Sequence, residues 1–340
     1  MNLTDPKFKD FALVKEMLET VGVMRGFKYG QGAAVVEEIK KAGRLFLTGE
    51  GSSRIFPAKN MMCELMRAGS SVSAATDGAR QAHAYNLKDY VVFGASNSGQ
   101  TKELISLYTQ LKGQGHEARY GLTANENTKL ESLSKQTFVL KCGGEDAVAA
   151  TKSVVEQALF YQSLVCDLVP GGCKCSDNLG QAADAAREVL EMDLDADMVQ
   201  AIANAPTIYF AGRNNGVAEE LTLKTNEITR KKSDFLEGTY AVHGIEEVMD
   251  PKDVVIVVDP FAEEAEKFKQ VLCDGVGMKV FAISGGDTLF PTIRIPKVWG
   301  FDTFLQLLAG WNILVHVGVA KGINLDKPVR ARKVGNEFMG

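Results

Sequence analysis

Residues 90–101 read YVVFGASNSGQT, an apolar run that ends in small hydroxyl residues. A helical pattern continues from there to Gly113, so this stretch predicts a strand, a tight turn and the start of a helix. Such a turn directs backbone N–H groups and the positive end of the helix dipole at one point. The side chains of Ser96, Ser98 and Thr101 add hydroxyls there. We therefore expect the turn to bind an anion such as a phosphate group.

The spacing of this turn separates it from two better-known phosphate loops. No Lys follows Gly99, as a Walker loop requires, and the Gly-x-Gly-x-x-Gly pattern of dinucleotide turns is absent from residues 90–101. A monophosphate on a small molecule therefore fits better than a nucleotide. The alternative for this single loop is an ordinary helix cap built from Ser, Asn and Gly.

Length and composition narrow the class of protein. A chain of 340 residues predicts about two domains at ~100–200 residues each. The 45% share of hydrophobic residues and the mean hydropathy of -0.06 are typical of a compact globular protein. A net charge of -5 argues against nucleic acid or an anionic membrane as partner. We find no signal-peptide pattern and no apolar stretch of the ~18 residues that a membrane span needs, so we expect a cytoplasmic protein.

The six cysteines are expected to be reduced thiols, because a cytoplasmic chain of this size rarely carries a disulfide framework. Cys166, Cys173 and Cys175 lie close together but match no zinc spacing and have no His nearby in the sequence. We therefore predict no metal site and no cofactor.

The chain contains an internal repeat. Residues 45–49 resemble residues 208–212, and residues 91–93 resemble residues 254–256, with one offset of 163 residues (212 − 49 = 163; 254 − 91 = 163). Strand-like runs alternate with helical patterns in both copies, which favours parallel sheets covered by helices. We predict an α/β chain of two domains, residues 1–170 and 171–340. The loops at 49–53 and 96–101 are expected at the carboxyl ends of strands, where such sheets bind ligands.

The loop 51–53, the loop 96–101, the segment EDAVAATK at 145–152 and the duplicated plan together resemble the sugar isomerase (SIS) domain family. As a double SIS protein, the chain is similar in layout to the isomerase half of glucosamine-fructose-6-phosphate aminotransferase and to ketosamine-6-phosphate deglycases. The resemblance implies two tandem SIS domains, each a flavodoxin-like three-layer sandwich. It also implies a phosphorylated sugar as ligand, and it assigns contacts to that ligand to nine residues: Gly51, Ser52, Ser53, Ser96, Asn97, Ser98, Thr101, Val148 and Thr151. Ala150 departs from the Ser often found at its position in the family.

The resemblance places the acid and base in the second copy. Glu227 and His243 are separated by sixteen residues (243 − 227 = 16), as are the family's glutamate base and its histidine. A carboxylate can move a proton between C1 and C2 of an open-chain sugar, while a second group assists ring opening. Glu227 suits the first role and His243 the second. Without the resemblance, Glu227 is one more solvated helical glutamate and His243 a loop histidine bonded to backbone.

The C-terminal segment contains a candidate amine. An Asp-x-Pro element at 326–328 resembles the family element that precedes a lysine in contact with the open-chain ketose, and Lys333 takes that position. An amine attacks a carbonyl only when neutral, which requires a pKa lowered to roughly 7–8. The alternative is a solvated basic tail.

Two departures limit what the resemblance implies. The second copy has VDPFAEE at 258–264 where the first has its hydroxyl loop, so we expect one phosphate site per chain. The sequence contains no glutaminase domain, and we expect no transfer of ammonia from glutamine. Members of the family complete the pocket across a dimer interface, which implies a homodimer or higher homo-oligomer.

The resulting hypothesis is an isomerase or deglycase that acts on a phosphorylated ketose, amino sugar or Amadori compound. The alternative is a phosphosugar sensor that binds without turnover. A sensor could lose Glu227 or His243, whereas this chain keeps both. Residues 4–21 also predict a single helix rather than a DNA-binding helix-turn-helix.

Overall fold

The computed structural model describes residues 1–169 and 171–330, and these fold into two compact units, each built on one sheet. The N-sheet unit contains Gly22–Glu145 and Ala150–Asp177; the C-sheet unit contains Met1–Val21, Asp146–Ala149 and Asn178–Val329. The predicted boundaries 1–170 and 171–340 stay a prediction, because the units do not follow a single cut. The Glu16 carboxylate accepts the N–H groups of Asp146 and Ala147, which groups that short segment with the first helix.

The N-sheet unit contains a parallel sheet of five strands in the order β2-β1-β3-β4-β5. The strands are β1 (Arg44–Gly49), β2 (Ser73–Gly78), β3 (Val91–Ala95), β4 (Arg119–Thr123) and β5 (Gln136–Val139). The strands β1, β3 and β4 are almost fully buried, as expected for parallel strands that helices cover on both faces.

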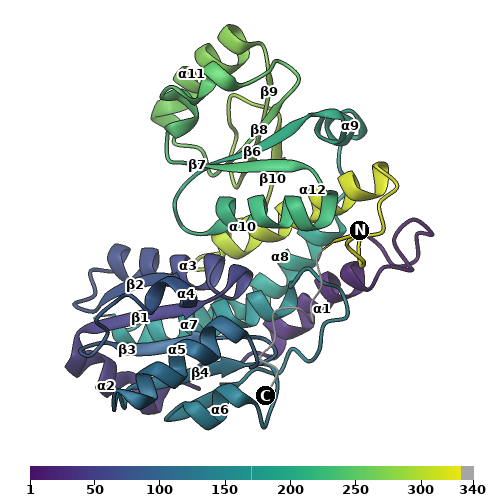
Figure 1. Cartoon of the computed structure of the whole chain (residues 1–340). Coiled ribbons are helices and arrows are strands. Elements are labelled where there is room, and N and C mark those ends of the chain that lie inside the picture. The colour runs from purple at the N-terminus through teal and green to yellow at the C-terminus, as the bar shows by residue number, and fades with distance from the viewer. Residues whose placement is uncertain (170, 331–340) are drawn as a thin grey trace. The chain divides into compact units, whose positions relative to one another are not determined.

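Helices cover both faces of this sheet (Figure 1). They are α2 (Ala33–Ala42), α3 (Ile55–Arg67), α4 (Ala79–Ala82), α5 (Lys102–Gly113), α6 (Lys129–Leu133) and α7 (Lys152–Leu168). Val92 points to one face, where it joins a core with Leu104 and Tyr108 of α5. Phe93 points to the opposite face, with its ring 6.0 Å from that of Phe160 on α7. The alternation along β3 thus supplies both cores.

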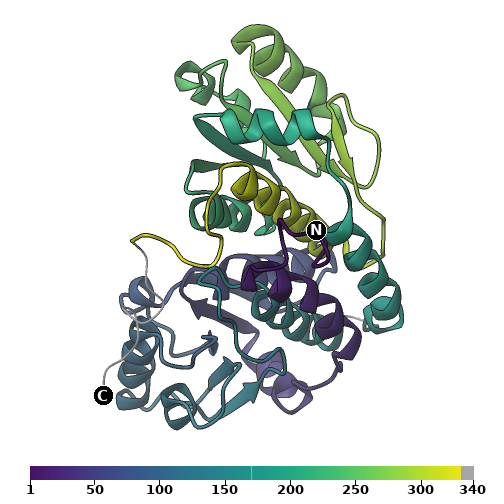
Figure 2. The same cartoon turned by 90° about the vertical axis from the view of Figure 1, so that its right-hand side faces the viewer.

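The C-sheet unit has a second parallel sheet in the order β10-β9-β8-β6-β7. Its strands are β6 (Thr207–Gly212), β7 (Lys232–Glu237), β8 (Val254–Val258), β9 (Lys279–Ser284) and β10 (Thr292–Arg294). Its helices are α8 (Leu179–Glu191), α9 (Ala196–Asn204), α10 (Val217–Lys224), α11 (Ala265–Phe268) and α12 (Asp302–Ala320), and the helix α1 (Ala12–Gly26) begins here. Both views place α11 and α12 on opposite sides of this sheet (Figures 1 and 2).

The predicted repeat is confirmed by the two sheets. If the five strands of each sheet are numbered in chain order, both sheets have the spatial order 2-1-3-4-5. This is the flavodoxin-like order. The registers agree as well: Leu45 pairs with Val91 in one sheet and Ile208 with Val254 in the other, each at the offset of 163 residues (208 − 45; 254 − 91). The predicted α/β class with two parallel sheets flanked by helices is therefore confirmed.

Two expectations about apolar and helical segments are wrong. The helix predicted over residues 4–21 begins only at Ala12, after a series of turns. α12 is long and apolar enough to cross a membrane, with a mean hydropathy of 1.4, whereas we expected no such stretch. Of that window 78% is buried inside the structure, and the large side chains of Phe304 and Trp311 are fully covered. Burial in its own unit explains the apolar composition of this helix.

The expectation of six reduced thiols is also wrong, because the structure contains a disulfide between Cys166 and Cys173. Cys63, Cys142, Cys175 and Cys273 are free thiols. The pairing is not apparent from the sequence, because two cysteines seven residues apart can meet only if the chain turns back at the end of α7.

Candidate functional site

The two hydroxyl loops leave the N-sheet side by side. Gly49, the last residue of β1, pairs with Ala95, the last residue of β3. The strands approach so closely that a Cβ on Gly49 would lie 2.6 Å from the carbonyl oxygen of Ala95. The loops 50–53 and 96–101 therefore start from neighbouring positions at the carboxyl edge, as the sequence predicts. That they face one pocket stays a prediction.

The loop 96–101 is held by a network of its own backbone and side chains. The hydroxyls of Ser96 and Thr101 lie 2.8 Å apart, and the Ser98 hydroxyl accepts the N–H of Gln100 at 3.2 Å. Gly99 has φ +65, and a Cβ there would lie 2.5 Å from Thr128, so only glycine fits. Ser96 is buried while Ser98 and Thr101 are partly exposed, so these two hydroxyls are the more accessible ones.

The helix that follows begins directly at this loop. α5 starts at Lys102, with Thr101 at its N-cap position and without a hydrogen bond from the Thr101 side chain to the helix. The N–H groups of a first helical turn lack intrahelical partners and carry partial positive charge. The arrangement of two accessible hydroxyls before a helix N-terminus is one that binds phosphate oxygens.

Glu145 connects this loop to α7. Its carboxylate accepts the side-chain N–H of Asn97 at 2.8 Å, the N–H of Thr151 at 2.7 Å and the hydroxyl of Ser153 at 2.6 Å. Asn97 is thus bonded to a carboxylate, and Thr151 is fully buried. In the sequence, Glu145 is only the first residue of the motif at 145–152, and its positioning role is not apparent there.

The first loop carries its predicted ligands on a short turn, η1 (Gly51–Ser53). Gly51 has φ +54 and is exposed, Ser52 is buried, and Ser53 is partly exposed. Burial raises the pKa of the neighbouring Glu50 carboxyl above its usual range, and the like charge of Glu103 adds to this. A carboxyl with a raised pKa is less ionised at a given pH, so it repels a nearby phosphate less.

Val148 is half-buried and is grouped with the C-sheet unit. Its predicted role as a ligand stays a prediction.

Glu227 lies in a π-helical turn, η3 (Thr225–Thr229), that continues α10. Such turns are frequent at functional sites. Its carboxylate accepts a hydrogen bond from the Lys224 ammonium group at 2.8 Å, and its side chain is 29% exposed. Lys224 is fully buried and forms a second ion pair with Glu220 at 3.5 Å. This buried lysine orients the predicted base and was missed in the sequence, where it looks like any helical lysine.

His243 is exposed and follows the short turn η4 (Tyr240–Val242) in the same unit. Its Nε2 atom lies 3.4 Å from the Lys267 ammonium group. Glu227 is bonded to Lys224 and His243 lies beside Lys267, so their joint action stays a prediction.

The segment that leads to Lys333 is tied to the same turn as Glu227. The Arg230 guanidinium donates to the carbonyl oxygens of Glu227, Asn324 and Lys327. Asp326 of the Asp-x-Pro element accepts the N–H groups of Ala12 and Leu13 at 3.0 and 2.8 Å, which caps α1. Lys333 itself lies outside the described residues. Its predicted role therefore stays a prediction.

Comparisons with known proteins show what the chain is similar to. Residues 38–166 match the model of the SIS domain family. The glutamine–fructose-6-phosphate aminotransferase (isomerizing) of Sulfolobus acidocaldarius is 22% identical over 312 residues, which cover 86% of this chain and 50% of that protein. The chain spans about half the length of the curated relatives it matches, or less.

Solved structures share the fold across almost the whole chain. The C-terminal domain of glucosamine-fructose-6-phosphate aminotransferase from Francisella tularensis has a TM-score of 0.76 at 17% identity and covers 94% of this chain and 98% of its own. Glucosamine-6-phosphate deaminase from Thermotoga maritima has a TM-score of 0.74 at 20% identity, covering 95% and 98%. Tagatose-6-phosphate ketose/aldose isomerase from Escherichia coli has a TM-score of 0.74 at 18% identity, covering 96% and 98%.

Proposed function

We propose that this chain, whose residues 38–166 match the SIS domain family model, is an SIS phosphosugar enzyme that moves a proton between C1 and C2 of a phosphorylated ketose or ketosamine. The observation that supports this most directly is the hydroxyl loop 96–101 at the carboxyl edge of the N-sheet, next to the end of β1. The loop fixes the sugar through its phosphate. The reaction is then performed on the open chain.

In the proposed mechanism, Ser98 and Thr101 donate their hydroxyls to phosphate oxygens, and the N-terminus of α5 adds its partial positive charge. Hydrogen bonds to a charged group contribute about 1.5–3 kcal/mol each. Glu145 positions Asn97 and the start of α7. Gly51 and Ser53, which are exposed and partly exposed, contact the sugar, while Ser52, Val148 and Thr151 stay predicted ligands.

Glu227 removes the proton from one carbon and returns it to the other. Its exposed part is accessible to a substrate, while the ion pair with Lys224 holds the carboxylate in place. His243 assists ring opening, and Lys333 polarises the carbonyl. This chemistry uses side chains alone.

The same groups support two outcomes. An oxygen or a retained amine at the reacting carbons gives aldose-ketose isomerisation, whereas a substituted amine that leaves gives deglycation or deamination. We favour an amino-sugar or Amadori phosphate, because both the aminotransferase and the deaminase named above act on amino sugars or produce them by name. We also propose a homodimer or higher homo-oligomer and a cytoplasmic location.

The test is an assay of the purified chain in deuterated water against fructose-6-phosphate, glucosamine-6-phosphate, tagatose-6-phosphate and 6-phosphorylated fructose-amino-acid conjugates. Release of free amine with glucose-6-phosphate identifies a deglycase, and deuterium incorporation without amine loss identifies an isomerase. Phosphate-dependent binding without exchange in any of the sugars contradicts the proposal and identifies a sensor.

The matched variant is Glu227→Gln. We expect turnover to fall by about 10²–10⁴-fold while the sugar phosphate still binds, because a proton acceptor is lost and the phosphate loop is untouched. Glu188→Gln, an exposed carboxylate on α8 of the same unit, is the control and should keep full turnover. Equal loss of turnover in both variants, or none in either, contradicts the role of Glu227.

A further inference from the structure

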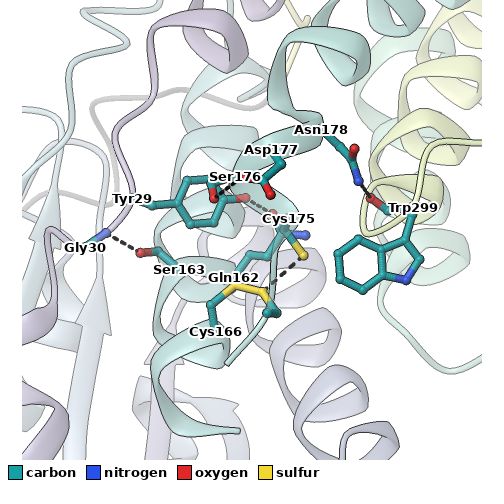
Figure 3. The surroundings of a disulfide bond; sticks show 11 residues. Tyr29, Gly30, Gln162, Ser163, Cys166, Cys175, Ser176, Asp177, Asn178 and Trp299 are labelled. Carbon is teal, nitrogen blue, oxygen red and sulfur yellow. Dashed lines mark hydrogen bonds between the residues drawn. A yellow bond between two sulfur atoms is a disulfide. The ribbon is translucent and has the colours of Figure 1, made fainter. Parts of the chain in front are cut away.

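Three cysteines of the N-sheet unit meet at the C-terminal end of α7 (Figure 3). Cys166 lies on the last turns of α7, Cys173 in the loop that follows, and Cys175 at the start of the turn η2 (Cys175–Asn178). Cys166 and Cys173 form the disulfide, and the Sγ atom of Cys175 lies 3.3 Å from that of Cys173. All three sulfur atoms lie within 4.8 Å of one another. The disulfide uses two of these cysteines, and Cys175 is a free thiol beside it.

The backbone between these cysteines is suited to bring the sulfurs together. Gly171 and Gly172 have φ +76 and φ +70, a conformation that residues with a Cβ rarely adopt. The N–H of Gly172 donates to the carbonyl of Val169 at 3.1 Å, which closes the turn. The chain therefore reverses after α7 and returns Cys173 and Cys175 to the side of Cys166.

We propose that, when the disulfide is reduced, Cys166, Cys173 and Cys175 bind one thiophilic cation of the Zn²⁺ class through their three sulfurs. Zinc–sulfur bonds of about 2.3 Å place tetrahedral ligand sulfurs about 3.8 Å apart. The 3.3 Å separation of Cys173 and Cys175 and the 4.8 Å limit for the group bracket that spacing. Thiolates are the ligands that select such soft or borderline metals.

The group of potential ligands contains these three cysteines only, among the residues that the structure describes. A tetrahedral cation would therefore take its fourth ligand from solvent or from a small molecule. Cys175 is buried and the other two are partly buried, so the cation would be shielded but reachable.

The redox step and the binding step are separate. A dithiol reductant gives two electrons and two protons to the Cys166–Cys173 disulfide and itself becomes a disulfide. The cation then displaces the protons of three thiols and is held by three thiolates. A disulfide oxidant that accepts two electrons re-forms the Cys166–Cys173 bond by thiol–disulfide exchange, is itself reduced to thiols, and the cation is released.

The cysteines lie at the opposite end of α7 from Thr151, one of the predicted sugar ligands. Cys166 is fifteen residues along the same helix from Thr151 (166 − 151 = 15), a rise of about 22 Å. It is one helical turn from Gln162 and Ser163, which bind the Tyr29 hydroxyl at 2.6 Å and the Gly30 N–H at 2.8 Å (Figure 3). A bound cation would thus fix the end of α7 beside the segment that enters α2, which is a structural and redox-dependent role.

The experiment uses the whole chain, purified anaerobically, with Co²⁺ or Zn²⁺ alone as the probe. We expect the dithiol-reduced chain to bind one equivalent of Co²⁺ with sulfur-to-metal charge-transfer absorption, and the oxidised chain to bind none. Cys175→Ser should weaken binding by more than roughly tenfold, since even outer-shell changes cost that much. Cys273→Ser, a partly buried thiol of the C-sheet unit, is the control and should bind as the unchanged chain does.

A second measurement needs no variant and so does not depend on whether Cys175→Ser folds. Alkylation of the reduced chain, mapped by peptide mass spectrometry, should show that Zn²⁺ protects Cys166, Cys173 and Cys175 together. Equal alkylation with and without Zn²⁺, or no charge-transfer absorption in the reduced chain, overturns the proposal and identifies a disulfide with a neighbouring thiol. Neither outcome depends on sugar turnover.

Discussion

At the scale of single residues, Lys224 shows what a buried charge contributes. An isolated ammonium group is costly to bury, and Lys224 is paired with Glu220 and Glu227. The family resemblance predicted a role for Glu227 but gave no sign of Lys224, because nothing in a helical lysine reveals that it faces inward. Glu145 was missed for the same reason. Its partners lie 48 and 8 residues away in the chain, so their convergence is a product of the fold.

His316 gives a prediction about pH. It lies in α12, donates through Nδ1 to the Asn312 carbonyl oxygen at 2.9 Å, and packs edge-on against Phe8 at a ring distance of 5.0 Å. Burial lowers its pKa below the ordinary 6.5. Between the folded and unfolded pKa values the unfolded chain binds the proton and the folded chain does not, so stability falls as the pH falls below 6.5.

The matched variant is His316→Phe, which keeps a ring against Phe8 and removes the titration. We expect its melting temperature to drop less than that of the unchanged chain on going from neutral to acidic pH. Parallel melting curves for the two proteins across this range would show that His316 does not contribute.

At the scale of one element, α5 packs closely against β3 because Gly94 has no side chain. A Cβ there would lie 2.7 Å from Leu104 and from Tyr108, both fully buried on α5. Gly94→Ala should therefore destabilise the chain by about 1–3 kcal/mol, because the packed helix must move. Since α5 begins at the hydroxyl loop, the shift should also weaken sugar-phosphate binding.

Gly113→Ala at the other end of α5 is the control for this prediction. No atom lies within 4 Å of a Cβ built there, and alanine is the better helix former by about 0.5–1 kcal/mol. Urea unfolding should give a lower midpoint for Gly94→Ala and an equal or higher one for Gly113→Ala. If both variants unfold like the unchanged chain, the close packing at Gly94 carries no cost.

The elements themselves were largely predictable. The helix expected to continue from the hydroxyl loop to Gly113 is found at Lys102–Gly113. Apolar runs bounded by turn residues identify these elements locally. The start of α1 was not predictable in this way, since its cap is Asp326, which lies more than 300 residues away in the chain.

At the scale of the whole molecule, the offset of 163 residues predicted two sheets of one topology, and both sheets have it. The disulfide was not predicted, because the composition of a chain indicates only how often such chains contain disulfides. This pairing depends on the local turn at Gly171 and Gly172. The two copies differ in the loops that follow corresponding strands, since the loop after β3 contains hydroxyl residues and the loop after β8 contains acidic ones.

In the second copy, the loop after β8 occupies the position of the hydroxyl loop, and its side chains already have partners within the C-sheet unit. Arg213 forms an ion pair with Asp259 and lies 4.3 Å from the Phe261 ring centre. Asp259 has φ +50, an uncommon conformation for a residue other than glycine. This loop offers carboxylates in place of hydroxyls, so we predict that each chain binds one sugar phosphate and that the N-sheet unit binds it.

Isothermal titration with fructose-6-phosphate or glucosamine-6-phosphate measures this stoichiometry. Ser98→Ala should weaken binding roughly tenfold or more, since a hydrogen bond to a charged group contributes about 1.5 kcal/mol at least. Ser284→Ala, which removes a hydroxyl at the end of β9 in the C-sheet unit, is the control and should leave binding unchanged. Two equivalents per chain, or equal losses in both variants, would mean that the second copy keeps a phosphate site despite its acidic loop.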